Sequence, residues 1–184
     1  MRPLLDLDHQ LIDRTPGLEH PVLTAVFVVV SAWWVKGPLL IAVALCADAW
    51  RKRVPIAFAA TGAAVLSSSL AINALKEVFD RPRPPSQDAG IAPLVPTPES
   101  ASFPSGHAGS AFAAAAAIAV LCPRLRWPAL GLAAAVALSR VYLRVHFPLD
   151  IAVGAAIGAA LGVICAVVTV RVLRSASSPS PRLT

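Results

Sequence analysis

The residues with the clearest chemical potential are His146 and Asp150, which lie four positions apart. Pro148 between them is typical of the first turn of a helix, so Asp150 is expected in that turn and His146 just ahead of it. Side chains at this spacing can reach one another. A carboxylate on one imidazole nitrogen fixes the tautomer and leaves the other nitrogen available as a nucleophile. The alternative is an aspartate that satisfies the helix N-terminus beside an uninvolved histidine.

A second histidine, His107, follows Pro104, Ser105 and Gly106 at the start of an alanine-rich stretch. This pattern predicts a helix N-terminus, where unpaired N–H groups and the positive end of the helix dipole bind anions. Gly106 would let an anion approach the backbone closely. Ser105 could instead be only an N-cap, and His107 only a polar residue near an interface.

Basic residues accompany both histidines. Lys76, Arg81 and Arg83 end another apolar stretch, and Arg140 precedes His146. Such side chains can be anchors that reach lipid headgroups from a helix end. They can also balance the charge of a phosphate dianion and its transition state, which is the main task in phosphoryl transfer. If these segments meet on one face, one histidine could attack phosphorus while the other protonates the leaving oxygen.

Two other uses of the same residues are a metal site and a binding site without catalysis. His107, His146 and Asp150 could ligate zinc, but the surrounding Lys and Arg side chains would repel a divalent cation. Neither a metal nor another cofactor is therefore expected. A transporter or lipid-binding protein could hold a phosphate in a cationic pocket without cleaving it. An imidazole oriented by a carboxylate favours catalysis, because binding alone does not need one.

The composition indicates that membrane helices position these segments. Of the 184 residues, 57% are hydrophobic and 14% are charged, whereas a soluble protein has about 25% charged residues. The apolar residues form stretches suited to a bilayer, which takes roughly 20 residues per helix. The net charge of +6 does not indicate nucleic-acid binding, because the basic residues lie in short groups at the ends of apolar stretches.

The predicted fold is an all-α polytopic membrane bundle of about six transmembrane helices. Residues 17–50 are apolar but interrupted by Lys36-Gly37-Pro38, which breaks a helix. Two short helices, about 17–35 and 37–50, are expected there, with Lys36 at an interface; one kinked helix is the alternative. The remaining helices are expected at 54–79, 105–121, 125–142 and 148–174, with the proline-rich residues 80–103 as a loop.

The two ends of the chain are predicted to flank a transmembrane domain of residues 16–174. Residues 1–15 place leucines at helical spacing opposite polar side chains, which predicts an amphipathic helix at the membrane surface. Residues 175–184 are rich in serine and proline, which predicts a disordered cytoplasmic tail.

Small residues and charges predict how the helices pack and how they are oriented. Gly154, Gly158 and Gly162 repeat every fourth residue, a spacing that favours close helix packing within the bundle over a dimer seam. Excess Lys and Arg mark the cytoplasmic side of a membrane protein. The basic residues of three connections would share one end of the bundle, so the site is expected to face the extracytoplasmic side. These residues follow the second, fourth and sixth predicted helices and are Arg51, Lys52, Arg53, Arg124, Arg126, Arg171, Arg174 and Arg182.

The three site segments resemble the tripartite signature of the type 2 phosphatidic acid phosphatase family. The segments are Lys76-x6-Arg83-Pro84, Pro104-Ser105-Gly106-His107 and Ser139-Arg140-x5-His146-x3-Asp150, with no departure at any signature position. The family includes undecaprenyl diphosphate phosphatases and shares its site with vanadium haloperoxidases, which are soluble and so differ from this apolar chain.

The resemblance implies a metal-independent membrane hydrolase that acts on a lipid phosphate. His146 is similar to a nucleophile that forms a phosphohistidine, oriented by Asp150, and His107 is similar to the general acid. The implied phosphate-binding groups are Lys76, Arg83, Ser105, Gly106 and Arg140, with Arg81 outside the signature as a candidate contact to a second phosphate. Polyprenyl diphosphate, phosphatidic acid, phosphatidylglycerol phosphate and a polyprenyl-phosphoryl sugar phosphate all fit as substrates. The oligomeric state is left open.

Overall fold

The computed structural model describes residues 2–51 and 55–176, which form helices joined by turns and loops. The all-α prediction is confirmed. Residues 52 and 53 of the basic turn and residues 177–184 of the predicted tail lie outside the described residues. In chain order the helices are α1 (Arg2–Asp13), the 3-10 helix η1 (Thr15–Leu18), α2 (Pro21–Val30), α3 (Pro38–Trp50), α4 (Ile56–Phe79), α5 (Pro84–Gln87), α6 (Gly106–Leu121), η2 (Pro123–Leu125), α7 (Arg126–Tyr142) and α8 (Pro148–Ala176).

Helices α4, α6, α7 and α8 lie close to their predicted positions, and their ends have local causes. α6 begins after Pro104, and the alanines that follow have the highest helix propensity. It ends at Leu121, and only Cys122 separates this end from Pro123, which cannot continue the helix. α4 ends at Phe79, and the next residue, Asp80, has a φ of 37°, in the left-handed region that terminates many helices.

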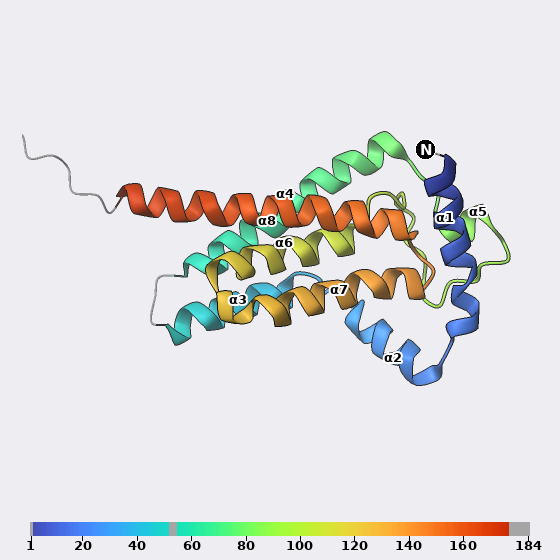
Figure 1. Ribbon diagram of the computed structural model, residues 1–184, viewed down its shortest axis with the longest axis horizontal. Helices are drawn as coiled ribbons and strands as arrows, with labels where there is room; N and C mark the ends of the chain where they lie inside the picture. The colour runs from blue at the N-terminus through green and yellow to red at the C-terminus, as the bar shows by residue number, and fades with distance from the viewer. Residues whose placement is uncertain (1, 52–54, 177–184) are drawn as a thin grey trace, which may run out of the picture.

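Helices α2 and α3 are two short helices, but they do not cross the bundle twice. α2 begins at the end of the bundle where α7 finishes, because the His20 N–H donates to the Tyr142 hydroxyl over 3.2 Å. α3 finishes where α6 finishes, because Arg51 donates to the Leu121 carbonyl over 3.2 Å. The two helices therefore run in the same direction and traverse the bundle once, interrupted at residues 31–37 (Figure 1).

The interruption changes the predicted count of helical crossings. The described helices traverse the bundle five times, by α2 with α3, and then by α4, α6, α7 and α8 (Figure 1). Helix α1 lies across one end of the bundle, the end that also has the loop after α4 and the turn before α8 (Figure 1). The end of α3, the start of α4 and the end of α6 lie at the opposite end of the bundle, together with the last turns of α8.

Glycines on α8 allow this helix to approach α6 at backbone distance. A Cβ atom on Gly154 would lie 2.5 Å from the Ser105 carbonyl oxygen. Added Cβ atoms on Gly158 and Gly162 would collide with the carbonyl oxygens of Gly109 and Ala113. The predicted role of the repeated glycines in packing within the bundle is therefore confirmed.

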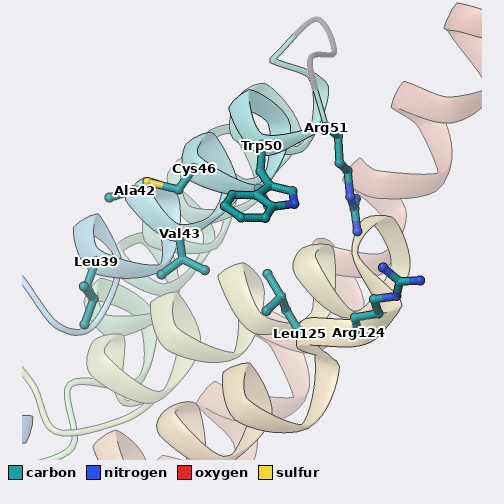
Figure 2. A pocket seen from close by; sticks show the side chains of 9 residues that line it. Leu39, Ala42, Val43, Cys46, Trp50, Arg51, Arg124 and Leu125 are labelled. Atoms are coloured by element: carbon teal, nitrogen blue, oxygen red, sulfur yellow. The ribbon is translucent and has the colours of Figure 1, made fainter.

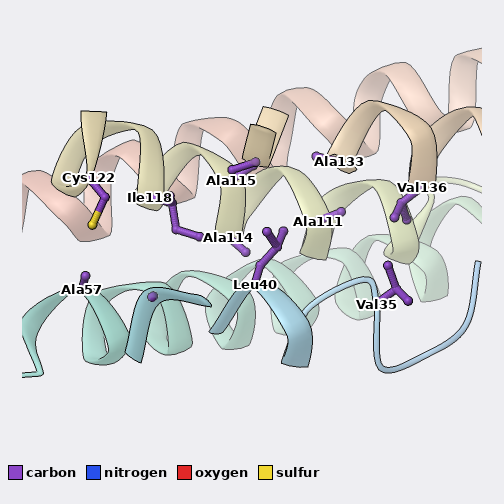
Figure 3. Packing of buried hydrophobic residues seen from close by; sticks show 12 residues of the cluster. Val35, Leu40, Ala57, Ala111, Ala114, Ala115, Ile118, Cys122, Ala133 and Val136 are labelled. Atoms are coloured by element: carbon purple, nitrogen blue, oxygen red, sulfur yellow. The ribbon is translucent and has the colours of Figure 1, made fainter. Parts of the chain in front are cut away.

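The core of the bundle is built from small residues of α6. Ala111, Ala114 and Ile118 are fully buried, and they lie between α7 and the pair α3 and α4 (Figure 3). Because alanine side chains are short, they bring α6 close to its neighbours on every side. The N-terminus of α6 is consequently held at a fixed position between α7 and α8, which is where the predicted site residues lie.

Two of the described helices have the length and composition expected of membrane spans. Among the described residues, Ile56–Gln87, which contains α4, and Pro148–Leu173 are long and apolar enough to cross a membrane. α2, α3 and α6 are shorter apolar helices. Large apolar side chains point outward from the long helices, such as Leu66 and Leu70, each 62% exposed.

Candidate active site

His146 and Asp150 lie together at the start of α8, as their spacing predicts. Pro148 and Asp150 occupy the first turn of this helix, and His146 lies in the turn that follows α7. The imidazole Nδ1 lies 3.4 Å from Asp150 Oδ2. Both side chains are almost completely buried. A carboxylate in this position favours the tautomer with a proton on Nδ1, which leaves the Nε2 lone pair free to react.

Ser102, which the sequence analysis did not single out, completes the surroundings of the Asp150 carboxylate. Its hydroxyl donates to Asp150 Oδ2 and lies 3.3 Å from His146 Nδ1. The Phe147 N–H also donates to Oδ2, over 2.9 Å. Ser102 is fully buried, and it follows a proline-rich loop without any spacing that could have linked it to a helix 48 residues later.

The reactive face of His146 points toward cations. Nε2 lies 3.2 Å from Arg83 Nη1. Burial is the main cause that lowers the pKa of His146 to about 4, and the nearby Arg83 lowers it further, while the hydrogen bond to Asp150 opposes both. The imidazole is therefore neutral over the physiological pH range, as a nucleophile must be.

The helix start that carries His107 is joined directly to the helix start that carries Asp150. The Ser105 N–H donates to the Asp150 carbonyl oxygen over 2.9 Å. The His107 and His146 side chains are close enough for their charges to interact. The Ser105 hydroxyl is buried and has no hydrogen-bond partner among the described residues. A buried hydroxyl of this kind usually has a partner in native proteins, so this position is suited to an acceptor from a ligand.

Lys76 and Arg83 are brought together by the loop that precedes α6. Lys76 Nζ donates to the Ala101 carbonyl over 2.5 Å and to the Ser100 hydroxyl over 3.2 Å. Arg83 donates through Nε to the Ser100 carbonyl over 2.9 Å and through Nη1 to the Val145 carbonyl over 2.7 Å. These contacts hold both cations in place before any ligand binds. Arg83 lies beside His146, and Lys76 is close enough to Arg83 and Asp150 for their charges to interact.

Arg140 lies on α7, and its guanidinium contacts residues 31–37, the segment that separates α2 from α3. Its Nη1 donates to the Ser31 hydroxyl, while its Nε is buried without a hydrogen-bond partner among the described residues. Lys36, expected at a membrane interface, instead lies close enough to Arg140, Lys76 and His107 for its charge to act on each. The sequence showed a helix break at Lys36, but only the fold shows that the break faces the site.

Arg81 occupies a supporting position rather than the space in front of Nε2. Its Nη1 lies 2.7 Å from Asp150 Oδ1, and its Nη2 lies 2.6 Å from Asp8 Oδ2 on α1. The guanidinium also lies over the Phe147 ring, 4.0 Å from the ring centroid. Both terminal nitrogens are therefore bonded to carboxylates, a contact that the prediction of a second phosphate did not anticipate.

The arrangement joins a neutral, oriented imidazole to a group of cations and to the Ser105 hydroxyl, which has no partner among the described residues. These features can bind a tetrahedral dianion and attack its central atom. In the part of the chain that the structure describes, no three His, Cys, Asp or Glu side chains are grouped so that they could hold a metal ion. The cationic surroundings also disfavour a metal on electrostatic grounds.

Similarity to known proteins agrees with this geometry. Over its full length the chain resembles the crystal structure of the first transmembrane PAP2 type phosphatidylglycerolphosphate phosphatase from Bacillus subtilis, with a TM-score of 0.72, 25% identity and 90% of that chain covered. The crystal structure of Aquifex aeolicus LpxE is similar over 90% of this chain and 95% of its own, with a TM-score of 0.69 and 27% identity.

Curated relatives match a shorter part of the chain. The decaprenylphosphoryl-5-phosphoribose phosphatase of Mycolicibacterium smegmatis is 39% identical over 99 residues, which are 52% of this chain and 51% of that protein. The lipid A 1-phosphatase of Rhizobium etli is 35% identical over 111 residues, which are 58% of this chain and 48% of that protein. The chain spans about half the length of the curated relatives it matches. A family model described as the PAP2 superfamily matches residues 56–174.

Proposed function

Because the chain belongs to the PAP2 superfamily, we propose that it is an integral membrane hydrolase that removes phosphate from a lipid phosphomonoester or diphosphate. The observation that carries this proposal is the position of His146. Its Nδ1 faces Asp150 and its Nε2 faces Arg83, so one nitrogen is oriented while the other points to where an anion would bind. The two histidines, from segments far apart in the sequence, serve one site.

The proposed reaction has two steps. In the first, His146 Nε2 attacks phosphorus, a P–N bond forms, and the bond from phosphorus to the lipid oxygen breaks. His107 gives its proton to that oxygen, while Asp150 stabilises the positive charge that develops on the His146 ring. In the second step water attacks the phosphohistidine, transfers a proton to His107 and releases inorganic phosphate, which restores both histidines.

The donors of the site fit the oxygens of the transferred phosphoryl group. Arg83 already lies at Nε2. The Arg140 Nε and the Ser105 hydroxyl are two buried donors of this site that have no partner among the described residues. A phosphate oxygen would satisfy each of them. Lys76 and the N–H of Gly106 complete the proposed set, and Lys36 adds a further positive charge at its edge. Arg81 is proposed to contribute through Asp150.

The proposed substrate is the whole class of lipid phosphates, because the donors of the site would bind the phosphate group rather than the lipid part. Similar proteins are named for a phosphorylated polyprenyl sugar, for lipid A and for phosphatidylglycerolphosphate, which share a phosphate on a lipid. Polyprenyl diphosphate and phosphatidic acid remain candidates on the same ground. A direct comparison of turnover on these lipids with the purified protein would rank them.

The proposed location is the cell membrane, with several crossings and with the site on the extracytoplasmic side. Support comes from the apolar outer surfaces of α4 and α8 and from the distribution of charge. Arg51, Arg124 and Arg171 lie at the end of the bundle away from the site, and basic residues prefer the cytoplasmic side. A cysteine label introduced in loop 88–99 should react with an impermeant reagent added to intact cells.

The proposed activity is tested by phosphate release from lipid phosphates in EDTA. Wild-type protein should turn over, and His146→Ala should lose nearly all turnover. His20→Ala is a matched control, because the exposed His20 side chain lies outside the site. The wild type should also form an acid-labile, phosphate-labelled intermediate that His146→Ala lacks. Full activity in His146→Ala would refute the mechanism, and tight substrate binding without turnover in the wild type would favour a binding or transport protein.

A further inference from the structure

We propose that Asp8, on the N-terminal helix, is a positioning residue that sets the charge and orientation of the catalytic pair through Arg81. The inference rests on the proposed function. Asp8 is 2% exposed, whereas Asp6 and Asp13 on the same helix are exposed. A carboxylate is rarely buried to this extent unless it is paired, and the partners of Asp8 lie next to the site.

Both oxygens of Asp8 bind groups adjacent to the catalytic pair. Oδ2 lies 2.6 Å from Arg81 Nη2, and Oδ1 accepts the Leu149 N–H over 2.8 Å. Leu149 precedes Asp150, and Arg81 contacts Asp150 Oδ1 over 2.7 Å. Asp8 is therefore connected to Asp150 by two routes, through the guanidinium and through the backbone of the first turn of α8.

The charges explain why a second carboxylate is useful. Arg81 opposite Asp150 alone would form a neutral ion pair, which would stabilise a positive imidazole poorly. With Asp8 present, one guanidinium is shared by two carboxylates, so the group keeps a single negative charge facing His146. That charge stabilises the positive ring that forms when Nε2 bonds to phosphorus, and low exposure strengthens the effect.

Further contacts tie the N-terminal segment to the turn that carries His146. Arg144 donates to the Thr15 hydroxyl over 3.2 Å and to Glu19. The His9 and Phe147 rings lie edge to face, 5.0 Å apart. The N-terminal segment thus contacts residues on both sides of His146 in the sequence, Arg144 and Phe147.

The test measures Asp8→Asn, which removes the charge but keeps the shape and an oxygen for the Leu149 N–H. We expect kcat to fall about tenfold, equivalent to about 1.4 kcal/mol, with KM nearly unchanged because Asp8 lies away from the phosphate donors. Asp6→Asn is the matched control, because Asp6 lies on the same helix and is exposed. Its kinetics should equal those of the wild type.

A double-mutant cycle separates positioning from a general loss of structure. If Asp8 acts through Arg81, Asp8→Asn should have little further effect on kcat in an Arg81→Gln protein, so the two losses should not add. Additive losses, or an unchanged kcat in Asp8→Asn while the wild type turns over, would overturn the inference and leave the proposed function intact. Absence of turnover in the wild type would count against both.

A separate observation concerns the opposite end of the bundle, where the structure assigns a binding site for an anionic phospholipid. A pocket of about 520 Å³ lies between α3 and the turn from α6 to α7. Its walls are apolar, with Leu39, Val43 and Leu125 among them. Figure 2 shows Arg51 and Arg124 together at one end of this pocket and Leu39 toward the other. This assignment rests on the proposed location in a membrane.

The arrangement matches the two parts of an anionic lipid. Arg51 is fixed at the pocket by bonds from Nη1 to the Leu121 carbonyl and to Cys122 Sγ, and a guanidinium carries five N–H donors in total. Arg124 is exposed beside it. Two cations at the mouth of an apolar groove suit a phosphate headgroup with its acyl chain along α3. Trp50, 90% exposed at the rim, is suited to the headgroup level.

Trp50 provides the measurement. The protein in nanodiscs would be titrated with brominated phosphatidylglycerol or brominated phosphatidylcholine, and the Trp50 signal obtained as the difference between wild type and Trp50→Phe. Quenching of this signal should need about fivefold less of the anionic lipid, a preference of about 1 kcal/mol. Arg124→Gln should reduce the preference, whereas Arg126→Gln, a nearby arginine that does not line the pocket, should keep it. Equal quenching by both lipids, or an unchanged preference in Arg124→Gln, would show ordinary surrounding lipid only.

Discussion

Ser102→Ala tests whether hydrogen bonding at Asp150 supports the nucleophile. The Ser102 hydroxyl donates to Asp150 Oδ2 and lies 3.3 Å from His146 Nδ1. The substitution removes the hydroxyl and adds no bulk, so the helices that carry the site should stay in place. Because Ser102 does not contact Lys76 or Arg83 through its side chain, the phosphate donors should be unaffected.

The expected loss of kcat depends on the hydrogen bonds that the Asp150 carboxylate keeps without Ser102. A hydrogen bond to a charged group contributes about 1.5–3 kcal/mol. Asp150 keeps the Phe147 N–H at 2.9 Å and Arg81 at 2.7 Å, so the loss should lie near the lower limit. We therefore expect kcat to fall about tenfold, since each factor of ten corresponds to about 1.4 kcal/mol, while KM stays within about twofold of its original value.

The assay is steady-state phosphate release from a lipid phosphate in detergent micelles, with kcat and KM measured separately. Ser67→Ala is the control, because the Ser67 hydroxyl bonds to the Ala63 carbonyl of its own helix and lies away from the site. Thermal unfolding of both variants would show whether they are folded. A folded Ser102→Ala protein with unchanged kcat would show that this hydroxyl does not support the reaction.

Four further results are expected. Gly158→Ala should lower the free energy of unfolding by about 2 kcal/mol, because the added Cβ would collide with the backbone of α6. Gly131→Ala should leave the free energy of unfolding nearly unchanged, because a Cβ there would have no atom within 4 Å, and equal changes of Tm in the two variants would contradict the packing. Lys36→Gln should raise KM about fivefold, equivalent to about 1 kcal/mol, and an unchanged KM would exclude Lys36 from binding. The acid limb of kcat/KM should lie near pH 4, where His146 with its lowered pKa gains a proton and can no longer attack. A kcat/KM that does not fall below about pH 4, with rate-limiting chemistry, would oppose this role. Vanadate should inhibit turnover by adopting the five-coordinate geometry of the transition state, and an insensitive enzyme would contradict the pocket.

The sequence alone was sufficient to predict the helical class, the positions of four long helices and the close approach of α8 to α6. These features depend on local patterns: apolar stretches, prolines at helix starts, and glycines at every fourth position. The pairing of His146 with Asp150 was also predictable, because two residues four positions apart at a helix start are close whatever surrounds them.

The tertiary structure decided the features that join distant segments. Whether residues 17–50 cross the bundle once or twice depends on which neighbours α2 and α3 pack against, and no local pattern contains that information. The buried Asp8 is similar, because no local pattern assigned it a role, and the partner that compensates its charge, Arg81, lies 73 residues further along the chain. The roles of Ser102 and Lys36 could be recognised only in the folded chain. Their hydrogen bonds and charge interactions depend on distances in space, which the order of residues in the sequence does not give.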